Sequence, residues 1–538
     1  MTQTLRRVPG YTATVIAGSF AVLLAQVAYS LPGALNGTFQ QEFQATGSEL
    51  TWITAAFAIP MVVFELTTGV IGDLFGRKRL LQAGALLTVI GSLVAALAGT
   101  VQVMWVGQVV AGLGAAVLYP ISLAMIAALA PSHDARAKAI ALWAGFLSIG
   151  AAISPLLGGA FAASGNWRGA YIVVIVAALA SILITSRATD SSAPEGRKLD
   201  VPGQVTLAVG LIAVLYAATQ GSDSGFLQPS VVTAFVVGVL LLIAFVVIEL
   251  RTESPLLHLH LFANRAYAVV AIATVIGMFA FLATAFSMSI WLGAIQHQNP
   301  LIIGVMFLFI QGPAFVLVPV VSHLIRNVPA RWILTSGFVL MAAGGFWPST
   351  FDVNDMGWTR FIAPMLLLGM GFALTVGSIT AVAINTVPVR LAGMASATTN
   401  LLRDLGFALG PVLIGAVAFS KANEWMLEKI GPVIGASGLR PPFSDIAAGI
   451  AHQGGAMAIN SMPVVPGPGP DLPPVPMPAQ LQQLAFESLG DAFNTAFLLA
   501  GVCALLAAAL TLFGLFGHHE PSSEVESGEH DDELAATH

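Results

Sequence analysis

The chain is poor in cysteine and in charged residues. Of its 538 residues only Cys503 carries a thiol, and Asp, Glu, Lys and Arg together make up 9%. One thiol excludes an internal disulfide. A soluble domain carries about 25% charged residues, so this composition does not fit a soluble protein. The sequence also lacks a catalytic nucleophile motif and a phosphate-binding loop. Its histidines do not have the spacing of metal ligands, and it has no basic patch that would bind nucleic acid. We therefore expect no enzyme, no metal, no cofactor and no nucleic-acid partner.

Long apolar runs dominate the sequence instead, and hydrophobic residues make up 57% of it. A helix of about 20 predominantly apolar residues spans a bilayer. The runs predict fourteen such helices, at 12–34, 51–71, 80–98, 103–126, 136–161, 169–186, 203–220, 229–250, 267–293, 301–324, 331–348, 359–387, 391–418 and 488–516.

Lys and Arg are distributed unevenly between the two sets of loops. An even number of crossings puts both termini on one side. Sixteen of the 21 Lys and Arg residues then share that side, and the other side keeps Arg168, Arg360, Lys421, Lys429 and Arg440. Cytoplasmic loops carry the excess of positive charge. We therefore expect a multi-pass protein of the cell membrane with both termini in the cytoplasm.

A short charged loop joins the second and third apolar runs, and three consecutive cations at 77–79 place it on the cytoplasmic side. Its acid, Asp73, is suited to accept hydrogen bonds from a helix end or to pair with a nearby arginine. The loop is the candidate for a cytoplasmic latch, and the residues of this motif are Gly69, Gly72, Asp73, Gly76, Arg77 and Lys78.

This loop resembles the signature between the second and third helices of the major facilitator superfamily, with Leu74 in place of a usual basic residue. Fourteen spans, and the stretches at 197–203 and 249–262, are similar to its drug:proton antiporter branch. The resemblance implies an all-α integral membrane fold with two six-helix bundles and two accessory central helices. The implied parts are a first bundle at 12–186, a linker with the accessory helices at 187–250, a second bundle at 251–516 and an acidic cytoplasmic tail at 517–538.

The second bundle is expected to contain one long loop outside the membrane, at 421–486. Its stretch 464–478 is rich in proline and glycine and cannot hold a helix. We interpret the loop as a flexible connector. The alternatives are a lid over the outer vestibule and an arm that binds a partner.

The fifth run resembles the antiporter motif of the same branch, with Ser154 where a glycine is usual. Proline bends a helix, and small residues permit close contact with a neighbour. The motif predicts a pliable contact between the two halves; ordinary tight packing is the alternative. Its residues are Gly150, Ser154, Pro155, Gly158 and Gly159.

Two charges that are common in this branch are missing. The first run has no charged residue, and Gln108 stands in the fourth run where the branch has an arginine. Glu65 remains, eight residues before Asp73, or about 12 Å deeper along the helix. An ionised carboxylate at that depth is costly unless it faces water or a partner. Glu65 is therefore the candidate for proton coupling, and a structural glutamate is the alternative.

Several further residues are candidates for the transport path. Arg403 and Asp404 form either a gating ion pair or an interfacial anchor. Soft and aromatic side chains suit varied apolar substrates. The candidates for the cavity wall are Gln26, Tyr29, Trp52, Phe57, Met61, Gln108 and Trp291.

The resemblance implies a transporter that exports small amphipathic organic compounds by proton antiport with alternating access. Its implied partners are a small-molecule substrate, protons and membrane lipids, and we expect a monomer. One alternative is a lipid or metabolite transporter, or a facilitator, without the usual proton relay. Another is a membrane sensor or scaffold that transports nothing.

Overall fold

The computed structural model describes residues 10–192, 199–252, 255–387, 392–467 and 472–516. Twelve helices in these ranges are long and apolar enough to cross a membrane. Two of the predicted spans are not among these twelve. They correspond to α11 (Pro300–Val316) and α13 (Ala330–Phe346), which have 17 residues each, whereas the twelve helices have at least 18. The all-α membrane fold is confirmed, whereas the count of fourteen crossings is not. The predicted tail at 517–538 lies outside the described residues.

Six long helices form the first half of the molecule. Helix α1 packs on α5 and α6, α3 packs on α5, and α4 packs on α5 and α7. Local chemistry sets helix ends, as at Thr46, whose side chain and backbone exchange hydrogen bonds with Glu49 in a capping box. The helices are α1 (Tyr11–Ala34), α3 (Gly47–Phe75), α4 (Arg77–Ala96), α5 (Val101–Ala128), α6 (His133–Ala163) and α7 (Arg168–Ser186), with the short α2 (Asn36–Phe43) between the first two.

The second half contains α10, α11 and α13, together with α14, α15 and α17. Helix α10 packs on α15 and α17, and α13 packs on α14 and α17. A π-helical turn follows α10 directly, and α12 follows α11 after Leu317. The bounds are α10 (Arg265–Ser289), η2 (Ile290–Ile295), α12 (Val318–Asn327), α14 (Ile362–Asn385), α15 (Ala392–Ala436) and α17 (Ala479–Gly514), with 3₁₀ turns η1 (Leu259–Ala263), η3 (Pro348–Thr350) and η4 (Trp358–Phe361).

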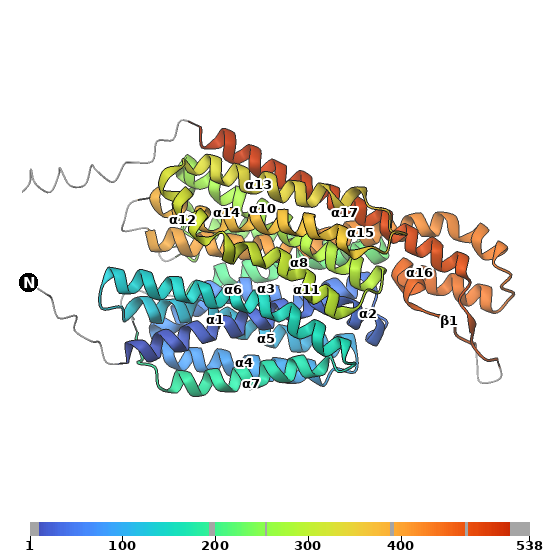
Figure 1. Cartoon of the computed structure of the whole chain (residues 1–538), viewed down its shortest axis with the longest axis horizontal. Coiled ribbons are helices and arrows are strands. Elements are labelled where there is room, and N and C mark those ends of the chain that lie inside the picture. The colour runs from blue at the N-terminus through green and yellow to red at the C-terminus, as the bar shows by residue number, and fades with distance from the viewer. Residues whose placement is uncertain (1–9, 193–198, 253–254, 388–391, 468–471, 517–538) are drawn as a thin grey trace, which may run out of the picture.

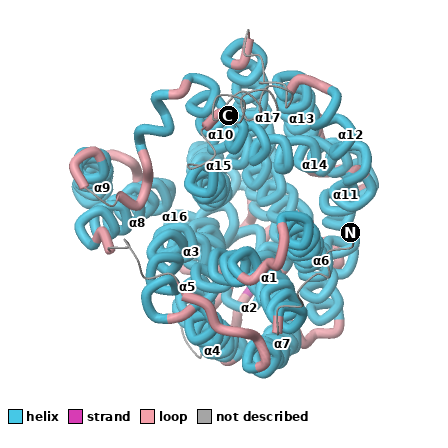
Figure 2. The backbone as a smooth tube through the Cα atoms, turned by 90° about the vertical axis from the view of Figure 1, so that its left-hand side faces the viewer, coloured by secondary structure: helices cyan, strands magenta, loops and turns pink. Residues whose placement is uncertain are grey.

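Two accessory helices connect the halves. Helices α8 (Val201–Ser224) and α9 (Pro229–Glu249) pack on each other. Helix α8 also contacts α3 and α15, so the pair lies beside the junction of the halves (Figure 2).

The prediction of one long loop at 421–486 is wrong. Helix α15 continues to Ala436, α16 (Phe443–Ser461) follows, and α17 begins at Ala479. The described residues of the stretch rich in proline and glycine lack a helix, and they form the strands β1 (Val464–Val465) and β2 (Val475–Pro476). Apolar residues at helical spacing stabilise this part by packing together, among them Met426, Ile430, Ala447, Ala451 and Leu481.

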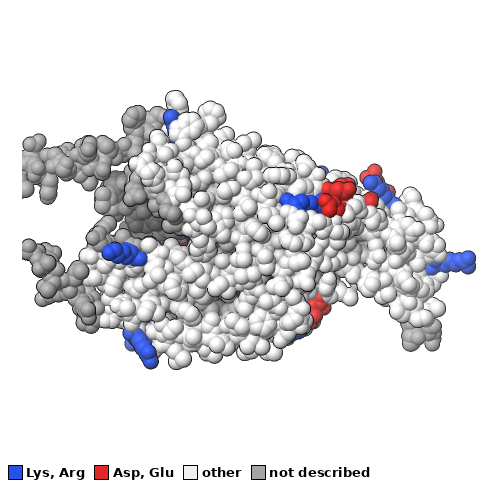
Figure 3. All heavy atoms as spheres, in the orientation of Figure 1, with Lys and Arg blue, Asp and Glu red and all other residues white. Residues whose placement is uncertain are grey.

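The bundle has two distinct ends. Helix α1 begins and α17 ends at the left in Figure 1, whereas α16 projects at the right. The turn at Gly76 lies at the end where α1 begins, because Gly76 lies against Asp190 and Gly10 lies against the neighbouring Thr189. We call these the Gly76 end and the α16 end. A broad band between them shows no charged side chains on the face drawn in Figure 3. Such a band suits contact with lipid.

Candidate functional site

The two halves meet along α3 and α15, which run antiparallel. Near the α16 end, Gly415 of α15 packs on Thr51 of α3. Apolar residues of both helices then form one cluster with α8. Further toward the Gly76 end, the contact reaches Glu65 on α3, which lies beside Arg403 and Asp404 on α15. Two candidate sites that sequence reasoning did not pair are therefore neighbours across the junction.

A partly buried ion pair forms the α15 side of this contact. Arg403 donates from Nε to Asp404 Oδ1 at 2.8 Å and from Nη2 to Asp404 Oδ2 at 3.0 Å. Its Nη1 also donates to Asn400 Oδ1 at 3.4 Å. Asp404 is 4% exposed and Glu65 is 8% exposed. Two-point contact of this kind holds the guanidinium in a fixed orientation.

Glu65 brings a second carboxyl group to the ion pair. Its side chain lies within hydrogen-bonding reach of Asp404. Glu65 Oε2 has no hydrogen-bond partner among the described residues. Because carboxylates only accept hydrogen bonds, two carboxyl groups bond to each other only when one carries a proton. The arrangement is therefore suited to bind and release a proton.

Helices α1 and α5 supply hydroxyl and amide groups to the same region. Tyr119 Oη donates to Gln26 Oε1 at 2.7 Å, and Gln26 Nε2 donates to Ser30 Oγ at 2.8 Å. The ring of Tyr29 lies 5.5 Å from that of Phe57. The charges of Arg403 and Asp404 act on both tyrosines. We call the following six residues the central cluster: Gln26, Tyr29, Glu65, Tyr119, Arg403 and Asp404.

Sequence reasoning did not include Tyr119 or Asn400 in the site. The signal for Tyr119 was available, because it is a polar aromatic residue before Pro120 within an otherwise apolar run. Asn400 lies one helical turn before Arg403, and this spacing places both on one helix face.

The other cavity candidates lie in different places. Phe57 and Met61 are buried on α3, the helix of Glu65. Trp52 packs against Trp105 and the cluster shared with α8. Trp291 is fully buried between the rings of Phe361 and Phe497 in the second half.

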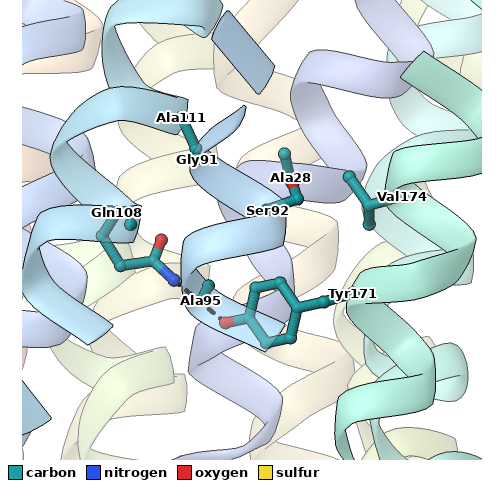
Figure 4. Close-up of a pocket in the computed structure, with 9 residues that line it drawn as sticks. Ala28, Gly91, Ser92, Ala95, Gln108, Ala111, Tyr171 and Val174 are labelled. Carbon is teal, nitrogen blue, oxygen red and sulfur yellow. Dashed lines mark hydrogen bonds between the residues drawn. The ribbon is translucent and has the colours of Figure 1, made fainter. Parts of the chain in front are cut away.

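Gln108 occupies a separate polar site inside the first half (Figure 4). Its Nε2 donates to Tyr171 Oη at 2.9 Å and approaches Met104 Sδ at 3.5 Å. The amide therefore finds its partners on α5 and α7, away from α15. It takes no part in the central cluster.

One face of the α6 motif packs on α1. Ser154 Oγ donates to the carbonyl of Val27 at 2.8 Å. A Cβ at Gly150 would lie 2.8 Å from the carbonyl oxygen of Leu23, and one at Gly158 would lie 3.2 Å from Leu31. These small residues hold α6 close to α1.

The other face of this motif contacts α11 of the second half. A Cβ at Gly159 would lie 2.4 Å from the carbonyl oxygen of Pro300. Reciprocally, a Cβ at Gly304 would lie 2.5 Å from the carbonyl oxygen of Pro155. The absence of side chains thus brings the backbones of α6 and α11 into direct contact across the junction.

The charged loop at the Gly76 end is tied to the first half. Gly76 has φ +100°, which favours glycine, and it ends α3. Arg77 Nη2 lies 2.7 Å from Asp73 Oδ1. Arg77 and Lys78 also donate to α5, to the last residue of α7 and to the segment that follows it, at Ala124, Ser186, Asp190 and Ser191. Gly72 packs on Ile121 of α5, and Gly69 faces open space.

The α16 end is closed by contacts between the halves. Asn36 Nδ2 donates to Ser289 Oγ at 3.1 Å. A Cβ at Gly37 would lie 2.3 Å from the carbonyl oxygen of Gly293. Together with the α6–α11 contact, these pairs join α2 and α6 to the second half. The partners named above for Arg77 and Lys78 all lie in the first half or its connector.

Within the described ranges, no group of three or more His, Cys, Asp or Glu side chains is placed to hold a metal ion. The central cluster presents hydroxyl, amide, carboxyl and guanidinium groups at the junction of the halves.

Comparison with known proteins identifies the family. The sequence profile of the Major Facilitator Superfamily matches residues 18–411. The multidrug resistance protein Stp of Mycobacterium tuberculosis is 28% identical over 380 residues, covering 70% of each chain. The tetracenomycin C resistance and export protein of Streptomyces glaucescens is 24% identical over 513 residues, covering 93% of this chain and 91% of the relative. The puromycin resistance protein pur8 of Streptomyces alboniger is 27% identical over 429 residues, covering 76% and 83%.

Solved structures agree on the fold. A bacterial homologue of the human lysosomal transporter Spinster, in an inward-facing and unoccupied conformation, is similar with a TM-score of 0.58 and 13% identity, covering 96% of this chain and 99% of the other. These findings confirm the resemblance that the charged loop and the α6 motif carried. The chain belongs to the Major Facilitator Superfamily and is a multi-pass membrane transporter rather than an enzyme.

Proposed function

We propose that the protein exports small amphipathic organic compounds across the cell membrane by proton antiport. Support for export comes from the relatives, which are named for multidrug resistance, for tetracenomycin C resistance and export, and for puromycin resistance. Support for proton coupling comes from the central cluster. The termini and the Gly76 end face the cytoplasm in this proposal, as the distribution of Lys and Arg predicts.

The observation that carries the proposal is the position of Glu65 beside Arg403 and Asp404 at the junction of the halves. When Glu65 is ionised, it competes with Asp404 for the same guanidinium. When it is protonated, it becomes a hydrogen-bond donor to Asp404. Proton binding therefore changes the contact between α3 and α15, which is the link that an antiporter requires between protonation and the arrangement of its halves.

Alternating access is the proposed mechanism: the halves rock about a site near the midplane. The contacts of Gly159, Gly304 and Asn36 close the α16 end. In this mechanism, that arrangement corresponds to a state open toward the Gly76 end. In the opposite state, the loop of Asp73 and Arg77 contacts the second half and acts as the cytoplasmic latch.

A flux assay with a matched pair of variants tests the proton site. Inverted membrane vesicles are energised, and the pH gradient is followed with a fluorescent weak base while ethidium or another test compound is added. We expect wild-type protein to dissipate part of the gradient when it carries the compound, and Glu65→Gln to lose this response. Glu424→Gln, at an exposed position on α15, is the control. A wild-type gradient response in Glu65→Gln would reject the role of Glu65.

One observation favours a second candidate, which is facilitated transport of a lipid or metabolite without a proton. The span-four position that carries an arginine in related antiporters holds Gln108, and its amide is satisfied by Tyr171. Proteoliposomes distinguish the two functions. Flux of the same compound with no dependence on an imposed pH gradient would establish facilitation and exclude antiport.

A further inference from the structure

A second pair of buried carboxyl groups lies at the base of the accessory helices. Asp200 precedes α8 and is 5% exposed, and Glu249 ends α9 and is 3% exposed. One oxygen of each is satisfied: Asp200 Oδ1 accepts from Gly203 N at 2.8 Å, and Glu249 Oε2 accepts from Leu257 N at 2.8 Å. The remaining oxygens, Asp200 Oδ2 and Glu249 Oε1, find no N–H or O–H donor in the described part of the chain.

Both of these oxygens lie over the same glycine. A Cβ at Gly203 would be 2.4 Å from Asp200 Oδ2 and 2.8 Å from Glu249 Oε1. The two carboxyl groups are within hydrogen-bonding reach of each other. Any side chain larger than hydrogen at this position would occupy the space in which they meet.

Neither of these two oxygens has a cationic partner among the described residues. Arg251, His258 and His260 lie on the connector that follows α9, with Arg251 exposed. The charged group that acts on Glu249 is Asp200, which has the same sign. Burial of two unpaired anions costs several kcal/mol per ion, whereas one proton shared between them removes a charge and supplies the missing donor.

We propose that Asp200 and Glu249 form a second proton-binding site in which one proton is shared between the two carboxyl groups. The proton bridges Asp200 Oδ2 and Glu249 Oε1, and it fastens the start of α8 to the end of α9. This site is independent of the central cluster in its residues and does not rest on the proposed antiport.

The site is nevertheless connected to the helix of Glu65. Gln204, next to Gly203 on α8, donates from Nε2 to the carbonyl of Val63 at 2.7 Å. Thr67 Oγ1 donates to Gln204 Oε1. Val63 and Thr67 lie two residues before and two residues after Glu65 on α3. A shift of the α8 start on proton release is therefore transmitted to the turn that carries Glu65.

The test measures thermal unfolding of the purified full-length protein between about pH 5 and about pH 9. Release of the shared proton at higher pH leaves two facing anions, so the wild-type Tm falls as the pH rises. Glu249→Gln retains the shape and offers Asp200 a permanent N–H donor. The Tm of this variant should therefore decrease less between about pH 5 and about pH 9 than the Tm of the wild type. We expect the same of Asp200→Asn.

Controls separate this site from other acids. Glu424→Gln should retain the wild-type profile. In a Glu65→Gln background, the fall in Tm should still respond to Glu249→Gln, which distinguishes the pair from the central cluster. A pH profile that is unchanged by Glu249→Gln, or by Asp200→Asn where the first variant does not fold, overturns the proposal.

Discussion

The contact between α6 and α11 permits a direct test of which end of the molecule is closed. The perturbation is Gly159→Ala, which adds one methyl group to α6 at the junction of the halves. The added Cβ would lie 2.4 Å from the carbonyl oxygen of Pro300, whereas ordinary van der Waals contact begins at 3.4 Å. The two backbones must therefore separate by about 1 Å for the methyl group to fit. This strain exists only in the state that is closed at the α16 end.

The size of the effect follows from the cost of overpacking. One extra methyl group in a tightly packed site costs about 1–3 kcal/mol. Each 1.4 kcal/mol changes an equilibrium about tenfold, so the population open at the α16 end should rise about 5- to 150-fold. The gain in helix propensity on replacing glycine with alanine applies to both states and cancels.

Cysteine accessibility measures this shift. In a Cys503→Ser background, Ser289→Cys places a thiol at a buried position of the closed end. A membrane-impermeant maleimide should label it faster in Gly159→Ala than in the parent. Gly145→Ala is the matched control on α6, because a Cβ there meets nothing within 4 Å. Equal labelling rates in Gly159→Ala and the parent would refute the argument that this contact holds the α16 end closed.

Three further predictions concern charged groups. Asp73→Asn weakens the pair with Arg77 and should lower export at unchanged protein level, measured as initial efflux rate. Asp404→Leu leaves Arg403 without its two-point partner and should cost about 3–5 kcal/mol of stability, measured by thermal unfolding; a smaller loss would mean that Glu65 replaces it. Partial desolvation lowers the pKa of His297, so the unfolded chain binds the proton first and the contribution of this one group to stability falls below about pH 6.5; His297→Asn should remove that contribution.

The sequence predicted the class of fold because membrane helices depend on composition. Runs of about 20 apolar residues, separated by charged loops, are enough to identify spans. Composition did not predict the helices that lie beyond the apolar runs. The segment at 421–461 mixes polar with apolar residues, and its helices depend on packing among α15, α16 and α17 rather than on hydropathy. The proline- and glycine-rich stretch was predicted correctly to lack a helix, because that rule is local.

The candidate site was predictable residue by residue but not as a site. Glu65 attracted attention because ionisable groups within membrane spans are costly. Arg403 and Asp404 attracted attention because Arg403 matches an arginine near the inner end of this helix in the family that the chain resembles. Nothing in a single sequence states that α3 and α15 run side by side, so their proximity required the structure. Tyr119 was missed for the same reason, since its importance comes from the neighbours on α1 and α15 rather than from its own run.

The positions of the charges bear on how coupling would work. The branch that this chain resembles commonly has an acid in the first span and an arginine in the fourth, both within one half. Here Gln26 and Gln108 are neutral, and Gln108 is bound within the first half. The ionisable groups lie instead at the junction, with Glu65 from one half and Arg403 with Asp404 from the other. A proton that binds at the junction alters the attraction between the halves directly and needs no relay through either one. On this reasoning, restoring an arginine at position 108 alone would bury a cation beside Tyr171 without a carboxylate partner, and it should destabilise the protein rather than restore a relay.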